Sequence, residues 1–242
     1  MHTEQNKIFQ RNIKPDKGSR DSLIYTLGIE STAHTFGVGI SENDKIIANE
    51  RDTLKPTSGG IIPREAAMHH FKLAPEIIKR ALDKSGLKLK DIDLFAFSQG
   101  PGIIPALKVG AQVSTFLSNK YKKKLIGVNH CIAHLEIARL YTKLKDPVML
   151  YVSGGNTQII TYYNGTYIVF GETQDIGIGN LIDKIGRRMD IPFPDGTKIE
   201  ETCHEEQKLH SNALQHRRYG CKYIWHRDIC ITIDMPPKCG RH

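Results

Sequence analysis

The two halves of the chain carry the same pattern of short strands. Apolar and polar residues alternate in two groups of three segments, 23–30, 34–41 and 45–50, then 148–152, 157–163 and 167–172. A period of two residues is typical of half-buried strands, and Asn164-Gly165 favours a tight hairpin within the second group. The repetition predicts an α/β fold with two similar lobes that face a cleft.

Helices are expected after each group of strands. Pro63 begins an amphipathic segment, and Gly100-Pro101-Gly102 turns the chain into a second helix. The expected helices of the first half span 63–84, 105–121 and 130–144, and strands over 94–98 and 125–128 separate them. Helices between strands agree with the α/β prediction.

Two histidines lie four residues apart at the start of the third expected helix. The spacing of His130 and His134 places both imidazoles on one helix face, as a divalent metal requires of two ligands from one helix. In the alternative interpretation, His130 caps the helix and His134 packs in the core. A helical metalloprotease has a glutamate directly after the first histidine, and Cys131 in that place disfavours peptide hydrolysis.

A turn of small residues follows the first strand of each group. In the second turn, Ser153-Gly154-Gly155, the glycines let backbone N–H groups approach anionic oxygens and the serine adds a hydroxyl donor. Asp183 lies near the start of a helix entered through residues 177–180. Its carboxylate either accepts a hydrogen bond from a ribose hydroxyl or is a solvated first-turn residue that the helix dipole favours. Both interpretations remain open.

The composition permits a globular protein and argues against a membrane span. Of 242 residues, 39% are hydrophobic, enough for a core, and no apolar run reaches the roughly 18 residues of a span. The polar first 22 residues fit neither a signal nor a transit peptide, so we expect a cytoplasmic protein. The net charge of +8 permits a nucleic-acid partner without indicating one.

Several longer motifs occur in an order that is similar to one protein family. These motifs cover 27–36, 63–67 with His69 and His70, 98–102, 128–134, 151–158 and 171–173. They resemble the tRNA threonylcarbamoyladenosine transferases of archaeal and eukaryotic type, the catalytic subunit of the KEOPS complex. The resemblance extends over about 27–201 and implies the two-lobed actin-like ATPase (ASKHA) fold, with an incomplete second lobe in this chain.

The resemblance also implies a site and a reaction. His130 and His134, with Tyr151 as a nearby third contact, would hold one Fe(II) or Zn(II) ion per subunit. Threonylcarbamoyl-AMP would be held by Tyr151, Val152, Ser153, Gly154, Gly155, Asp183, Gly196 and Glu200. The implied reaction transfers the threonylcarbamoyl group to N6 of the adenosine adjacent to the anticodon, in tRNAs that read ANN codons. The implied partners are tRNA and three KEOPS subunits: a kinase-like ATPase, a dimerising subunit and a regulatory subunit.

Two other functional classes remain beside this enzyme. A catalytically inactive relative would only bind the KEOPS partners through its first lobe. An actin-like ATPase or sugar kinase would share the fold, but such proteins lack the histidine pair.

The composition changes after Glu201. Residues 202–242 hold four of the five cysteines, five of the eleven histidines and the only tryptophan, without a clear period. The Cys and His spacings fit no zinc pattern, and a disulfide framework is not expected in the cytoplasm. A shift of one base in the reading frame, by contrast, permits a product similar to the next segment of the family. We therefore expect a frameshift after Glu201, with the loss of an aspartate metal ligand and an adenosine-binding asparagine that the family has there.

Four segments are thus expected. Residues 1–22 form a disordered extension, 23–146 the first lobe with the metal-binding helix, 147–201 the start of the second lobe, and 202–242 a non-native tail.

Overall fold

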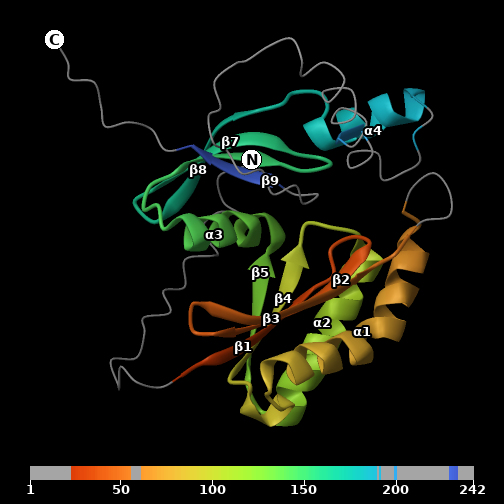
Figure 1. Cartoon of the computed structure of the whole chain (residues 1–242), viewed down its shortest axis with the longest axis vertical. Coiled ribbons are helices and arrows are strands. Elements are labelled where there is room, and N and C mark those ends of the chain that lie inside the picture. The colour runs from red at the N-terminus through yellow and green to blue at the C-terminus, as the bar shows by residue number, and fades with distance from the viewer. Residues whose placement is uncertain (1–22, 56–60, 190, 192–198, 201–228, 234–242) are drawn as a thin grey trace, which may run out of the picture.

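The computed structural model describes residues 23–55, 61–189, 191, 199–200 and 229–233. These residues form two sheets with helix α3 between them (Figure 1). In chain order the elements are β1 (Tyr25–Glu30), β2 (Thr35–Glu42), β3 (Lys45–Thr53), α1 (Pro63–Ser85), the short 3-10 helix η2 (Leu89–Asp91), β4 (Leu94–Gly100), α2 (Ile104–Tyr121), β5 (Lys124–Asn129), α3 (His130–Thr142), β6 (Val148–Val152), β7 (Thr157–Tyr163), β8 (Thr166–Glu172), α4 (Ile178–Arg188) and β9 (Ile229–Ile233).

The first sheet has five strands in the order β3-β2-β1-β4-β5. Strands β1, β2 and β3 form an antiparallel meander, and β1, β4 and β5 run parallel. Along β1, Leu27 and Ile29 are buried in the core with Phe36 of β2 and Ile77 of α1. Burial of each such side chain contributes about 1.5–3 kcal/mol. Because side chains alternate along a strand, Glu30 points to the face opposite Ile29.

The second sheet has the order β8-β7-β6-β9, and all its pairs are antiparallel. Helix α3 packs against it through a smaller core in which Leu135 contacts the group of Met149, Tyr151 and Ile160. The hairpin between β7 and β8 turns at Asn164 and Gly165, which both have positive φ, as the sequence predicts. Helix α3, which begins where β5 ends, therefore connects the first sheet to the second sheet.

The structure departs from the sequence expectations in a few places. Strand β1 begins at Tyr25 rather than 23, and α3 ends at Thr142 rather than 144. Strand β9 was not expected: it lies in the segment taken to lack a period, yet its run of β-branched residues pairs with β6. Among the described residues, no helix has the length and apolar character needed to cross a membrane.

Candidate functional site

Helix α3 begins without a loop where β5 ends. Asn129, the last residue of β5, is the N-cap, and its side-chain oxygen accepts a hydrogen bond from the N–H of Ile132 at 3.1 Å. The interpretation in which His130 caps this helix is therefore wrong. His134 is half-buried, and its ring lies beside that of Tyr151, a residue of the second core.

The two histidines face each other with the separation that a metal requires. Nε2 of His130 lies 3.3 Å from Nε2 of His134, and the rings meet edge to face at 88°. Two nitrogen ligands that bind a tetrahedral ion at about 2.1 Å lie about 3.4 Å apart. The pair therefore fits a metal ion that both Nε2 atoms would bind.

The other ring nitrogen of His130 contacts the first sheet. Its Nδ1 lies 3.2 Å from Oε2 of Glu30 and 3.5 Å from the hydroxyl of Thr32. The second carboxylate oxygen of Glu30 accepts a hydrogen bond from the backbone N–H of Thr32 at 2.7 Å. Burial raises the pKa of Glu30, but its hydrogen bond to His130, the charge of His130 and the Thr32 contacts outweigh burial, so that the pKa lies below its usual value.

Tyr151 reaches α3 from the second sheet. Its side chain is buried, and its hydroxyl donates to Sγ of Cys131 at 3.5 Å. Its ring centroid lies 6.1 Å from that of His134. Among the described residues, no group of three or more His, Cys, Asp or Glu side chains could hold a metal ion.

The turn after β6 is closed by its own hydrogen bonds. The hydroxyl of Ser153 accepts from the backbone and side-chain nitrogens of Asn156, at 3.1 and 3.2 Å, and the Ser153 N–H donates to the Asn156 carbonyl at 2.8 Å. Gly154 and Gly155 are exposed. A small ligand can therefore approach the backbone of these glycines.

The start of α4 packs directly on this turn. The N–H of Gly179 donates to the Ser153 carbonyl at 3.2 Å, and the N–H of Asn180 donates to the Gly154 carbonyl at 3.1 Å. A Cβ atom on Gly179 would lie 2.6 Å from the Ser153 carbonyl oxygen. Glycine is thus required for this close approach, and the positive end of the α4 dipole lies beside the turn.

The remaining residues implied by the resemblance are placed as follows. Val152 ends β6 and is half-buried, and Asp183 is half-buried on α4, one turn after Gly179. Glu200 is also half-buried, and Gly196 lies outside the described residues. The structure therefore brings together α3, the end of β6, the turn and the start of α4.

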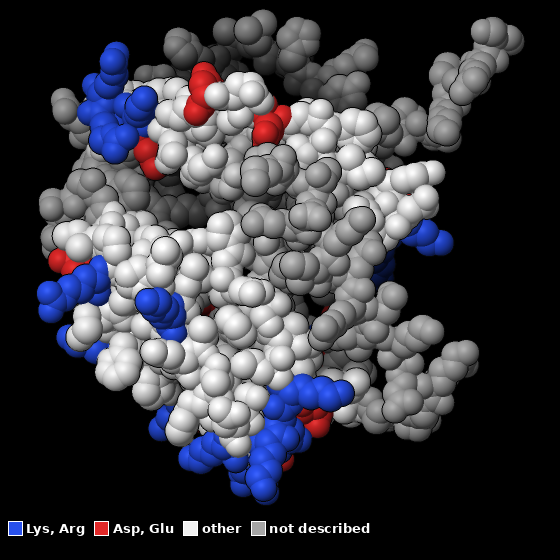
Figure 2. Space-filling view, turned by 180° about the vertical axis from the view of Figure 1, so that it is seen from behind, with Lys and Arg blue, Asp and Glu red and all other residues white. Residues whose placement is uncertain are grey.

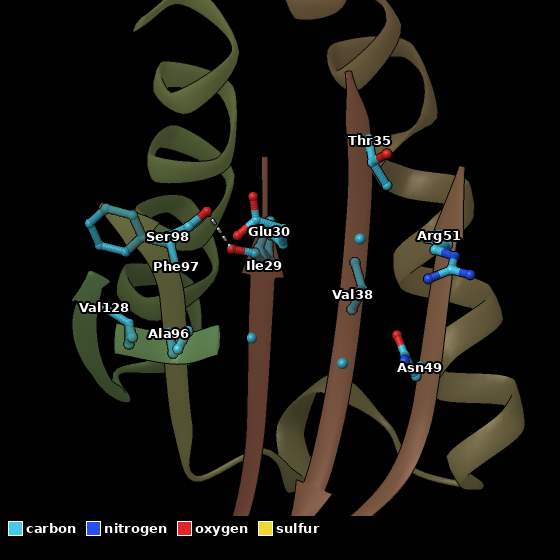
Figure 3. Close-up of a pocket in the computed structure, with 14 residues that line it drawn as sticks. Ile29, Glu30, Thr35, Val38, Asn49, Arg51, Ala96, Phe97, Ser98 and Val128 are labelled. Carbon is cyan, nitrogen blue, oxygen red and sulfur yellow. Dashed lines mark hydrogen bonds between the residues drawn. The ribbon is translucent and has the colours of Figure 1, made fainter. Parts of the chain in front are cut away.

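Sequence reasoning missed Glu30 and Thr32 as neighbours of the histidine pair. One signal was present, because a charged residue ends an otherwise apolar strand. Glu30 also lines a cavity of about 360 Å³ on the face of the first sheet (Figure 3). Ala133 of α3 lines the same cavity, together with Gly28, Gly37, Gly39, Asn49 and Arg51 of the first three strands.

Comparison with known proteins decides the family. Residues 44–231 match the family model of the tRNA N6-adenosine threonylcarbamoyltransferases (TsaD). The chain belongs to this family. It is 52% identical over 182 residues to the tRNA N6-adenosine threonylcarbamoyltransferase of Thermococcus sibiricus, a match that covers 75% of this chain and 56% of the relative.

Other transferase relatives agree with this assignment. The tRNA N6-adenosine threonylcarbamoyltransferase of Nanoarchaeum equitans is 50% identical over 184 residues, which cover 76% of this chain and 58% of the relative. The chain thus spans about half the length of the curated transferases that it matches. The expected family and the α/β fold class are confirmed, with strands and helices arranged around two sheets.

A solved structure with a lower similarity is the ethanolamine utilization protein EutJ from Carboxydothermus hydrogenoformans. It has a TM-score of 0.49 and 13% identity, and the match covers 80% of this chain and 67% of EutJ.

Proposed function

We propose that the protein to which this chain belongs transfers the threonylcarbamoyl group from threonylcarbamoyl-AMP to tRNA. The acceptor is N6 of the adenosine adjacent to the anticodon, in tRNAs that read ANN codons. The observation that carries this proposal is the histidine pair, with its Nε2 atoms 3.3 Å apart, beside a glycine turn in a chain 52% identical to named transferases.

The proposed metal site consists of His130 and His134 with Tyr151 as a third contact. It would hold one Fe(II) or Zn(II) ion, which when bound polarises the carbonyl of the threonylcarbamoyl group. The Nε2 separation supports two of the three contacts. Tyr151 is supported by its burial beside His134, and its hydroxyl would exchange the bond to Cys131 for the ligand position.

The proposed nucleotide site lies at the turn after β6. The exposed backbone of Gly154 and Gly155 would donate to the phosphate that leaves with AMP, and the N-terminus of α4 would stabilise its negative charge. Asp183, one turn further along α4, would accept from a ribose hydroxyl. In this proposal Tyr151, Val152 and Ser153 line the nucleotide site on the side of β6. Gly196 and Glu200 line its opposite side.

The reaction needs no nucleophile from the protein. The N6 amine of the adenosine attacks the carbamoyl carbon, the bond from that carbon to the phosphate oxygen breaks, AMP leaves, and the attacking nitrogen releases one proton to solvent. The protein's part is to hold the two substrates in line and to stabilise the charge that develops on the carbonyl and phosphate oxygens.

The experiment is a transfer assay with threonylcarbamoyl-AMP and an ANN-reading tRNA, followed by mass spectrometry of the tRNA nucleosides. The full-length protein should form threonylcarbamoyladenosine, and His130→Ala together with His134→Ala should reduce the rate by at least tenfold. A tRNA that reads no ANN codon serves as the control substrate. Phosphorylation of a small molecule without tRNA modification would instead indicate a kinase.

We further propose that tRNA and the KEOPS subunits, a kinase-like ATPase, a dimerising and a regulatory subunit, are the partners, and that the protein acts in the cytoplasm, where tRNA is used. Exposed apolar side chains support a protein partner of the first lobe: Met68 and Phe71 lie one turn apart on α1, and Phe116 lies on α2. Figure 2 shows a face of the first lobe on which Lys and Arg gather at the margins and few charges lie between them.

A second candidate function concerns the 242 residues themselves. The first lobe has its own core, whereas α4 exposes an apolar stripe of Ile178, Leu181, Ile185 and Met189. A chain with an incomplete second lobe would bind the KEOPS partners without transfer activity. Co-elution with the kinase-like ATPase, combined with no nucleoside product, is the result that supports this alternative.

We also propose that residues 202–242 result from a frameshift after Glu201. The change in composition supports this proposal, whereas the family match to residue 231 and the pairing of β9 with β6 favour a native tail. The shift lies either in the gene itself or in the reading of its sequence, and sequencing the genomic DNA across the codons for residues 201–220 separates the two cases. A base dropped or added relative to the genomic DNA would make residues 202–242 an artefact of a full-length transferase gene. Genomic DNA that encodes residues 202–242 would place the shift in the gene, and we then expect no transfer activity and poor solubility.

A further inference from the structure

Glu30 uses its two carboxylate oxygens for different partners. Oε2 lies 3.2 Å from Nδ1 of His130, a residue one hundred positions away in the sequence. Oε1 accepts the backbone N–H of Thr32 at 2.7 Å. The carboxylate is thus held between the turn that follows β1 and the first residue of α3.

The contact with Glu30 determines which nitrogen of His130 carries the proton. A carboxylate only accepts hydrogen bonds, so Nδ1 must be the donor. In the neutral imidazole, Nε2 is then the nitrogen that carries no proton, and this is the atom that lies 3.3 Å from Nε2 of His134. A carboxylate that accepts a hydrogen bond from the other ring nitrogen of a metal-binding histidine commonly fixes the orientation of the ring and raises its basicity.

The turn behind Glu30 is fixed by three other elements. The Ser31 N–H donates to the hydroxyl of Ser98 on β4 at 3.1 Å, and the N–H of Ile103, before α2, donates to the Thr32 carbonyl at 2.7 Å. Nε2 of the buried His70 on α1 donates to the Ala33 carbonyl at 3.1 Å. Glu30 is therefore held by a rigid part of the first lobe, as a precise ligand geometry requires.

We propose that Glu30 is a positioning residue: it accepts a hydrogen bond from Nδ1–H of His130 and so presents the lone pair of Nε2 to the metal. This role rests on the proposed metal site at His130 and His134. It adds to that site a carboxylate from β1, in the first lobe, which does not touch the metal or the substrate.

The test compares Glu30→Gln with the matched variant Glu42→Gln. Both remove one negative charge from the end of a neighbouring strand, but Glu42 accepts from the Tyr25 hydroxyl, away from the histidines. Co(II) is titrated into the full chain under reducing conditions, and the absorption lost in His130→Ala identifies the signal of the histidine site. Glu30→Gln should weaken Co(II) binding at this site by about tenfold or more, whereas Glu42→Gln should leave it unchanged.

A second readout needs no metal and no variant at Glu30. Long-range 15N–1H correlation of the imidazoles, assigned with the His130→Ala variant, reports the tautomer of His130. The proposal expects a proton on Nδ1 in the unaltered protein, and a proton on Nε2 alone overturns it even if Glu30→Gln fails to fold. Unchanged Co(II) affinity in a folded Glu30→Gln protein overturns it as well.

The same experiments separate this inference from the proposed metal site. If His130→Ala and His134→Ala leave Co(II) absorption unchanged, the metal site itself is wrong, and with it the positioning role toward a metal. If these variants lose Co(II) but Glu30→Gln does not, the metal site stands and only the role of Glu30 is refuted.

Discussion

Acid should destabilise the first lobe through one buried histidine, His70. Its side chain is fully buried on α1 and packs 5.5 Å from the ring of Phe36. Its burial, followed by the charge of His69, lowers the pKa of His70 from 6.5 to about 4, while the hydrogen bond to Ala33 and the charge of Glu30 act in the opposite direction. His70 is therefore neutral in the folded protein at any pH above about 4.

The hydrogen bonds around His70 accommodate a neutral ring. Nε2 donates to the carbonyl of Ala33, and in the neutral ring Nδ1, which lies 3.2 Å from Nδ1 of His69, is the acceptor. His69 then donates to His70, and its Nε2 lies 2.8 Å from the carboxylate of Asp52 on β3. With His69 as the donor, a proton added to Nδ1 of His70 would replace this hydrogen bond by a repulsion between two donors.

The size of the effect follows from the two pKa values. Above pH 6.5 the histidine is neutral in both the folded and the unfolded chain and contributes nothing to the pH dependence. Between pH 6.5 and about 4 only the unfolded chain binds the proton, so the free energy of unfolding falls as the pH falls. At about 1.4 kcal/mol per pKa unit, the loss approaches about 3 kcal/mol at pH 4.

The assay is urea unfolding, followed by far-ultraviolet circular dichroism, at several values from pH 7 to pH 4. The variant His70→Gln keeps an N–H donor for the Ala33 carbonyl but does not titrate. The carboxylates and the other histidines are present in both proteins, so the difference between the two unfolding free energies reports the replacement of His70. Parallel pH dependences of the two proteins would refute the reasoning, since they would show that His70 binds no fewer protons when folded.

Three further predictions concern the second sheet and the helices α3 and α4 that pack on it. Gly179→Ala places a Cβ 2.6 Å from the Ser153 carbonyl oxygen in the turn after β6. Urea unfolding should show a free energy of unfolding lowered by about 1–3 kcal/mol. Gly171→Ala, which has open space around its Cβ, should leave the free energy of unfolding unchanged. Arg139→Met removes a guanidinium that lies 3.6 Å from the centroid of the Tyr162 ring. The variant should lower the free energy of unfolding by about 1–2 kcal/mol. An unchanged free energy of unfolding would show that this cation–π contact does not stabilise α3 on the second sheet. Burial and a hydrogen bond to Glu136 raise the pKa of Tyr167. Tyr167→Phe should therefore remove absorbance change from the part of the alkaline titration above the usual tyrosine range, and loss of change within that usual range would contradict this.

Local patterns predicted most of the elements and half of the site. The strands and helices follow from periods of two and 3.6 residues, which neighbouring residues carry, and the single helix turn between His130 and His134 fixes their shared face. The contact of His130 with Glu30 has no such local signal, because it depends on the order of β1, β4 and β5 in the sheet. Strand β9 likewise depends on long-range pairing with β6, and five residues are too few to show a period.

The position of the site follows from two rows of side chains on α3. His130 and His134 form one row, which faces Glu30 of the first sheet. The next row is formed by Cys131 and Leu135, and it faces Tyr151 and the core of the second sheet. Because α3 continues β5 without a loop, the first lobe fixes the histidines and the carboxylate behind them. Tyr151 and the glycine turn that follows it move with the second sheet. Repacking of the second sheet would therefore displace the glycine turn and Tyr151 relative to a histidine pair that stays in place. The alignment of the proposed nucleotide and metal sites thus depends on the core between α3 and β6.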